Sequence, residues 1–171
     1  MTESPPPILL PERIQFIKKA VSKKNIFDSL TTLLAEGQSE ISPHRIFDAL
    51  IQREKLGNTS IGNEIALPRA HIKISYPRAA LLILKKPLMT TNSIDNKGIS
   101  LFLALLIPEE QRSNYADAVK NINQTLAISD KLHALIKSKN TESLSKYFNS
   151  LLTLRLLQPP EKEASTNKEE L

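Results

Sequence analysis

The sequence predicts a single α/β domain in which a β-sheet is covered by helices on both faces. Two amphipathic segments of helical period come first, three apolar runs of strand length follow, and three further helical segments come after them. Strands that lie between two groups of helices in the chain are most economically covered from both sides. The 171 residues suffice for one such core without a second domain.

Both early helices carry start and stop signals. Ser22 can cap the first helix, and Gly37 lies where a left-handed residue would end it. Ser42 and Pro43 begin the second helix, with proline at its first position, and Gly57 ends it. The buried faces are formed by Ile26, Leu30, Leu33 and Leu34 in the first helix and by Ile46, Phe47, Leu50 and Ile51 in the second.

The strands are predicted from apolar runs at residues 65–67, 79–84 and 99–107. The last run is nearly continuous, which is typical of a strand buried on both faces. Three helices complete the domain. The first has an apolar face that includes Ala118 and Ile122, the second is capped by Ser129 or Asp130, and Thr141 is the predicted cap of the third.

The ends of the chain differ in composition from the middle. Residues 1–11 contain four prolines and are expected to be a flexible or extended lead-in. Residues 158–171 are polar and charged without an apolar period, which predicts a disordered tail and leaves 12–157 as the folded unit. There is no secretory signal and no apolar run of membrane-spanning length, so a cytoplasmic protein is expected.

Composition excludes several chemistries. The chain has no cysteine, and its three histidines lack metal-ligand spacing, so neither a metal nor another cofactor is predicted. The net charge of +5 comes partly from lysine pairs at 18–19, 23–24 and 85–86. Nucleic-acid binding is an alternative function that rests on this charge alone, because no RNA-binding aromatic pattern or zinc finger accompanies it. Solvated surface lysines are the simpler interpretation.

The segment GNTSIGNEIALPRAH, residues 57–71, is the candidate for chemistry. It is neither a P-loop nor a dinucleotide fingerprint, because the required glycine and lysine spacing is absent. In an extended segment Arg69 and His71 point to the same face, since the side-chain period is two. That places a fixed cation beside a titratable imidazole.

The longer segment REKLGNTSIGNEIALPRAH, residues 53–71, resembles the signature of the fructose, mannitol and nitrogen-regulatory enzyme IIA domains of the phosphoenolpyruvate-dependent phosphotransferase system. The nitrogen-regulatory branch is the most similar. The likeness covers about residues 12–155 and includes IDNKGISLFLALLIPEEQ, an Ile-Asp turn followed by an apolar strand and proline. It implies the enzyme IIA type-2 fold, a single α/β domain with a central mixed β-sheet and helices on both faces.

This chain departs from the family pattern where phosphate would bind. The family places its phospho-acceptor histidine directly after the proline, and here that residue is Arg69. A guanidinium has no lone pair with which to accept a phosphoryl group. The position of the second active-site histidine corresponds to Tyr115. In the phosphate-site loop Gly57, Thr59 and Gly62 match the family, whereas Ser60 and Glu64 replace glycines.

The resemblance therefore predicts a regulatory protein of bacterial type that is similar to nitrogen-type enzyme IIA. It is expected to be a pseudo-phosphocarrier, which is catalytically degenerate, is not phosphorylated and acts by binding other proteins. Transporter and sensor-kinase regulators are the partners that the family implies, and membrane insertion is not expected. The alternative is an active phosphocarrier, in which His71 accepts a phosphoryl group from the histidine-containing carrier protein while Arg69 steadies its oxygens. The sequence leaves the partner and the oligomeric state open.

Overall fold

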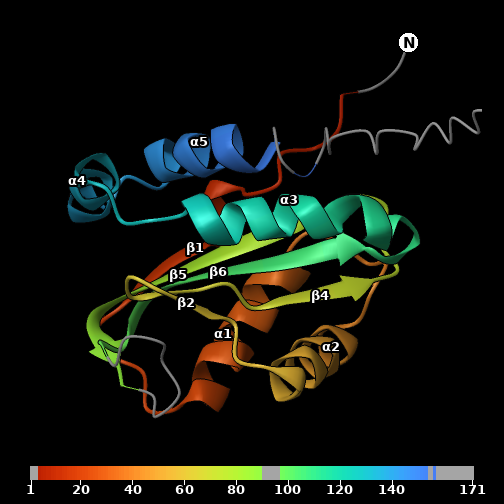
Figure 1. The fold of residues 1–171 in the computed structure, drawn as a ribbon, viewed down its shortest axis with the longest axis horizontal. Coiled ribbons are helices and arrows are strands. Elements are labelled where there is room, and N and C mark those ends of the chain that lie inside the picture. The colour runs from red at the N-terminus through yellow and green to blue at the C-terminus, as the bar shows by residue number, and fades with distance from the viewer. Residues whose placement is uncertain (1–3, 90–96, 154–155, 157–171) are drawn as a thin grey trace, which may run out of the picture.

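The structure is a computed structural model that describes residues 4–89, 97–153 and 156. For residues 111–115, within the second range, it describes the backbone alone. A mixed sheet lies between two layers of helices (Figure 1). The predicted fold class is confirmed. The predicted tail at 158–171 lies outside the described residues.

The sheet is built around one long buried strand, β6. Its order is β1-β5-β6-β3-β2, and β4 also pairs with β6 beyond β3. The pairs β1–β5, β3–β6 and β4–β6 are parallel, whereas β5–β6 and β2–β3 are antiparallel. The strands are β1 Ile14–Ile17, β2 Ser60–Gly62, β3 Ile65–Ala66, β4 Arg69–Ile72, β5 Arg78–Leu88 and β6 Ile99–Pro108.

The helices divide between the two faces of the sheet, as Figure 1 shows. Helices α1 and α2 share one hydrophobic cluster with the sheet, and α3, α4 and α5 share the other. The α-helices are α1 Lys23–Ala35, α2 Pro43–Leu56, α3 Arg112–Thr125, α4 Asp130–Ser138 and α5 Thr141–Leu152. Short 3₁₀ turns, η1 Pro11–Arg13 and η2 Glu109–Gln111, precede β1 and α3.

Side-chain caps start the helices, mostly as predicted. The hydroxyls of Ser22, Ser42 and Ser129 each accept a hydrogen bond from a backbone N–H of the first turn. The prediction that Thr141 caps α5 is wrong. Asn140 is the cap, because its amide oxygen accepts from the N–H of Ser143 at 3.0 Å while Thr141 is already helical.

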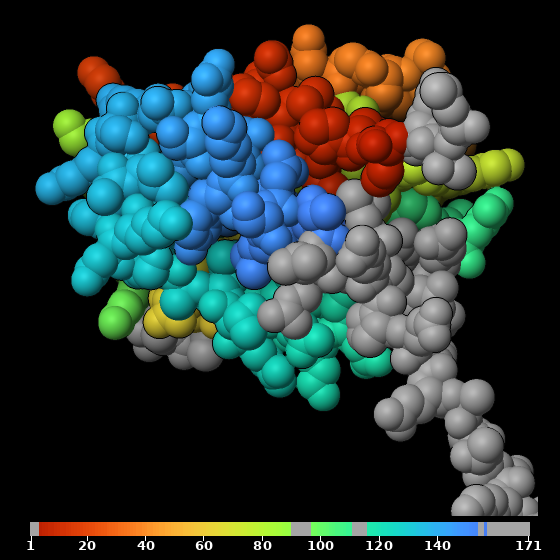
Figure 2. Space-filling model, turned by 90° about the horizontal axis from the view of Figure 1, so that it is seen from above, coloured from red at the N-terminus to blue at the C-terminus, as the bar shows by residue number. Residues whose placement is uncertain are grey.

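The N-terminal segment is part of the core. Ile8 and Leu9 are fully buried, and the folded unit therefore begins earlier than the predicted boundary at residue 12. The Leu9 N–H donates to Asn149 Oδ1 at 2.9 Å, and Ser145 Oγ donates to the Leu9 carbonyl at 2.7 Å. Figure 2 shows the two ends of the described chain side by side, with the N-terminal segment against α5.

Candidate functional site

The loop between α2 and β4 is a short hairpin with a strained turn. Strands β2 and β3 are joined by Asn63 and Glu64, both with positive φ, 55° and 63°. Two consecutive residues in this region are typical of a type I′ turn, for which glycine or asparagine is preferred. Gly62, with φ 81°, completes a run of three residues with left-handed backbone angles.

Glu54 holds the start of this hairpin in place. Its carboxylate accepts hydrogen bonds from Thr59 Oγ1 at 2.7 Å and from the Thr59 N–H at 3.3 Å, and it forms an ion pair with Lys23 Nζ at 2.5 Å. Arg53 donates from Nη1 to the Gly57 carbonyl at 2.9 Å. The last turn of α2 thus satisfies the polar groups of the loop that follows it.

Sequence reasoning assigned no role to Arg53 or Glu54, although both lie within the segment that carries the family likeness. The available signal was their position. Charged residues in the last helical turn before a glycine can bond the exposed backbone groups of the loop beyond it.

Arg69 and His71 lie on one face of β4, as the strand period predicted. The intervening Ala70 and the following Ile72 are buried in the cluster under α1 and α2. Arg69 and His71 therefore project toward the face covered by α3, where they pair in register with Leu105 and Ile107 of β6. Both side chains are half-buried.

The Arg69 guanidinium is held by its own chain. Nη1 donates to the Leu67 carbonyl at 3.2 Å. Burial lowers the pKa of Arg69, the nearby charge of Arg53 lowers it further, and Glu54 opposes both effects. A guanidinium stays protonated in proteins, so the side chain is cationic at neutral pH.

Glu64 does not neutralise this charge, since no ion pair joins it to Arg69 in the described part of the chain. The Glu64 carbonyl accepts from the N–H groups of Ser100 and Leu101, at the start of β6. Arg69 pairs with Leu105, farther along β6. Leu101 and Leu105 are four residues apart, which separates their backbones by about 13 Å along the strand. The hairpin turn and the Arg69 position are therefore separate places on the sheet.

Tyr115 belongs to the first turn of α3, which follows β6 through η2. The end of β4 pairs with the end of β6, Ile72 beside Pro108, so the backbone brings the start of α3 to the end of the sheet where β4 finishes. The Tyr115 side chain is not among the side chains that the structure describes. Of the predicted site residues, the fold groups Arg69 and His71 on one strand, while Ser60 and Glu64 lie in the hairpin.

The described residues contain no group of three histidine, aspartate or glutamate side chains that could hold a metal ion. Within the same residues, no helix is long and apolar enough to cross a membrane.

Comparison with known proteins agrees with this fold. The family model for the EIIA 2 component of the phosphoenolpyruvate-dependent sugar phosphotransferase system matches residues 7–151. A nitrogen regulatory protein homolog of Haemophilus influenzae is 31% identical over 145 residues, 82% of this chain and 88% of the relative. The crystal structure of nitrogen regulatory protein IIA-Ntr from Neisseria meningitidis aligns with a TM-score of 0.66 and 26% identity, over 85% of this chain and 97% of that one.

A more distant structure shares the fold. The complex of enzyme IIA mannitol and phosphorylated enzyme IIB mannitol from Escherichia coli contains a chain that aligns with a TM-score of 0.55 at 17% identity, over 84% of this chain and 96% of its own.

The chain therefore belongs to the EIIA type-2 family of the phosphoenolpyruvate-dependent sugar phosphotransferase system. Within that family it resembles the nitrogen regulatory proteins, which confirms the branch that the sequence predicted.

Proposed function

We propose that this nitrogen-regulatory-type EIIA protein is a regulator that accepts no phosphoryl group at residue 69 and acts by binding other proteins. The observation that carries the proposal is the half-buried, cationic Arg69 at the first position of β4, directly after Pro68. Phosphorylation regulates proteins by adding negative charge. A fixed guanidinium keeps positive charge at that position whatever the state of the phosphotransfer chain.

The charges around Arg69 support this reading. Arg53 and Glu54 are the two charged groups that act on its pKa, and Glu54 is already paired with Lys23. These four side chains comprise three cations and one carboxylate, so the surroundings stay positive. A permanently positive patch favours an acidic partner surface and accelerates its association.

An exposed apolar side chain lies beside these charges. Leu56, the last residue of α2, is 86% exposed and follows Arg53 and Glu54 by one turn or less. Arginine is enriched in protein–protein interfaces, and covering an exposed apolar side chain contributes favourable burial. A transporter or sensor-kinase regulator that docks on the end of α2 would bury Leu56 and meet the positive patch together.

The competing function is phosphoryl transfer to His71. His71 pairs with Ile107, two residues along β6 from the partner of Arg69, which displaces its backbone by about 6–7 Å. The Nε2 atom of His71 is also buried. In-line transfer between two docked proteins requires reacting atoms within about 3–3.5 Å, so a displacement of this size argues against the relocated acceptor.

The test is incubation with phosphoenolpyruvate and the two upstream carrier proteins, followed by intact-mass measurement and phosphoamino-acid mapping at alkaline pH, where phosphohistidine survives. The parent chain, Arg69→His and His71→Ala are compared. We expect no phosphate on the parent and one phosphate on Arg69→His, because the imidazole restores a nucleophile on the same scaffold.

Arg69→Lys is the matched control, since it changes the side chain without supplying an imidazole, and it should remain unmodified. A phosphate on the parent that disappears in His71→Ala would overturn the proposal in favour of an active carrier.

A further inference from the structure

A cavity of about 650 Å³ lies at the end of the sheet where β1 and β5 finish and β6 begins, between the sheet and α4. This volume is within the range of small-molecule sites. Arg69 pairs with Leu105, four residues along β6 from the lining residue Leu101, and neither Arg69 nor His71 lines the cavity. The cavity is therefore distinct from the Arg69 surface.

The floor of the cavity is apolar. It is formed by side chains from three strands and from α4 with its preceding loop: Phe16, Ile83, Leu101, Ile128 and Ile136. Phe16, Ile128 and Ile136 pack against the core on this side of the sheet yet remain only partly buried. Apolar side chains that line an open cavity gain free energy when a ligand covers them.

The rim of the cavity is cationic. Four lysines from three parts of the fold surround it, Lys18 after β1, Lys85 in β5, and Lys137 and Lys139 at the end of α4. None of the four forms an ion pair with a described carboxylate. His133 also lines the cavity, and Glu64 is its one acidic lining residue. The fold thus gathers lysines from chain positions up to 121 residues apart.

We propose that this cavity binds a small amphipathic anion, with an apolar body on the floor and a phosphate or carboxylate at the lysine rim. Both halves of the assignment rest on complementarity. Lysines bind phosphate and carboxylate groups as point charges, and the floor provides apolar area that an inorganic ion cannot use. A nucleic-acid strand would leave the floor uncovered unless a base stacked there, so a free small molecule fits the two features better.

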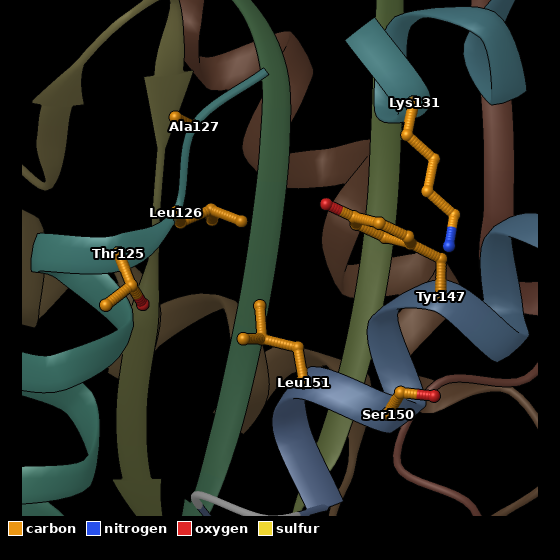
Figure 3. Close-up of a pocket in the computed structure, with 7 residues that line it drawn as sticks. All are labelled: Thr125, Leu126, Ala127, Lys131, Tyr147, Ser150 and Leu151. Carbon is orange, nitrogen blue, oxygen red and sulfur yellow. The ribbon is translucent and has the colours of Figure 1, made fainter. Parts of the chain in front are cut away.

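A second cavity gives a contrast within the same protein. It has a volume of about 380 Å³ and lies between the C-terminal end of α3 and the helices α4 and α5 (Figure 3). Its single lysine, Lys131, lies over the Tyr147 ring, with 5.9 Å from Nζ to the ring centroid. It offers one engaged cation where the larger cavity offers four lysines, so it is not assigned to the same ligand.

The test is calorimetric titration of the full chain with octyl phosphate and octanoate below their micellar concentrations, with inorganic phosphate and octanol as half-ligands. The double variant Lys85→Gln/Lys137→Gln removes two rim charges. Its matched control, Lys120→Gln/Lys146→Gln, removes two exposed charges from α3 and α5 outside the cavity.

We expect both amphiphiles to bind more tightly than either half-ligand. The rim variant should weaken octyl phosphate binding by about tenfold, and the control variant should leave it unchanged. Glu64→Gln should strengthen binding, because it removes the one carboxylate that repels the anion while keeping side-chain size. Thermal unfolding of each variant without ligand verifies that it is folded.

Three results would overturn the proposal: binding that the rim variant does not weaken, inorganic phosphate binding as tightly as octyl phosphate, or no binding by either amphiphile. Two further binding measurements distinguish other ligands that could engage the same lysines. Association with phosphatidylglycerol vesicles without binding of free octyl phosphate would indicate a membrane surface. Tighter binding of a single-stranded oligonucleotide would assign the lysines to nucleic acid. Either result would replace the small-ligand assignment.

Discussion

At the residue scale, the hairpin that precedes Arg69 depends on the carboxylate of Glu54. Glu54 accepts two hydrogen bonds from Thr59 and one ion pair from Lys23, and its side chain is 10% exposed. A carboxylate this far from water is costly unless its oxygens are satisfied. Thr59, which is 3% exposed, donates two hydrogen bonds to this carboxylate, and the same two bonds hold Thr59 in position.

This arrangement predicts that Thr59→Val, which keeps the shape and removes the hydroxyl, destabilises the protein by about 1.5–3 kcal/mol, the usual contribution of a hydrogen bond to a charged group. Urea unfolding measures the loss. Thr59→Ser retains the donor and should cost less. In a Glu54→Gln background the same Thr59→Val change should cost less than in the parent, and equal costs in both backgrounds would show that the two residues are not coupled.

At the element scale, the β2–β3 hairpin is closed by a turn whose second residue, Glu64, does not favour it. Glu64 adopts φ 63°, in the left-handed region that favours glycine. The left-handed conformation costs a residue with a Cβ about 1–2 kcal/mol. The turn persists because its neighbours are fixed, with the Glu64 carbonyl bonded to β6 and the Thr59 carbonyl accepting from the Leu67 N–H at 2.9 Å.

Glu64→Gly is therefore expected to stabilise the protein. Relief of about 1–2 kcal/mol of backbone strain outweighs the roughly 0.4–1 kcal/mol that glycine adds to the entropy of the unfolded chain. The net gain, about 0.8 kcal/mol at the centre of the two ranges and at most about 1.6 kcal/mol, is measurable as a higher urea midpoint with an unchanged slope. Glu64→Gln keeps the Cβ and should show no gain. A lower midpoint for the glycine variant would contradict the turn geometry.

At the scale of the whole molecule, the N-terminal segment connects the two ends of the chain. Ile8 and Leu9 are fully buried, and the polar groups of Leu9 bond to Ser145 and Asn149 in α5. Arg13 strengthens the junction, donating from Nη2 to the Ile8 carbonyl at 2.8 Å and from Nε to the Ala79 carbonyl at 3.0 Å. Burial lowers the pKa of Arg13 to about 10, and Arg78 adds to that effect.

Removal of residues 1–11 should destabilise the protein severely, although their composition resembles a linker. Two fully buried aliphatic side chains contribute about 3–6 kcal/mol together, a large part of the 5–15 kcal/mol typical of a domain. Removal of residues 1–5 is the control and should leave stability unchanged, since Ser4 and Pro5 are exposed. Urea unfolding measures the stability of both truncations and of Leu9→Ala, a milder variant. Equal midpoints for the two truncations would contradict a stabilising role for the buried N-terminal segment.

The sequence alone determined much of the fold and the position of the site. Helical and strand periods depend on local spacing, so α1, α2, β5 and β6 were predictable, and so were the caps Ser22 and Ser42. The loop signature placed Arg69 and His71 on one face because the strand period is a property of the backbone. Strand β1 has only four residues with one buried side chain, too little apolar pattern to be recognised.

Only the tertiary structure decided which distant residues meet. It separated Glu64 from Arg69, buried Ile8 and Leu9 against α5, and brought Lys18 and Lys85 together with the end of α4 around one cavity. None of these contacts follows from local spacing. Each depends on which strands pair with β6 and in what register, and those pairings are set by long-range burial that a one-dimensional pattern does not encode.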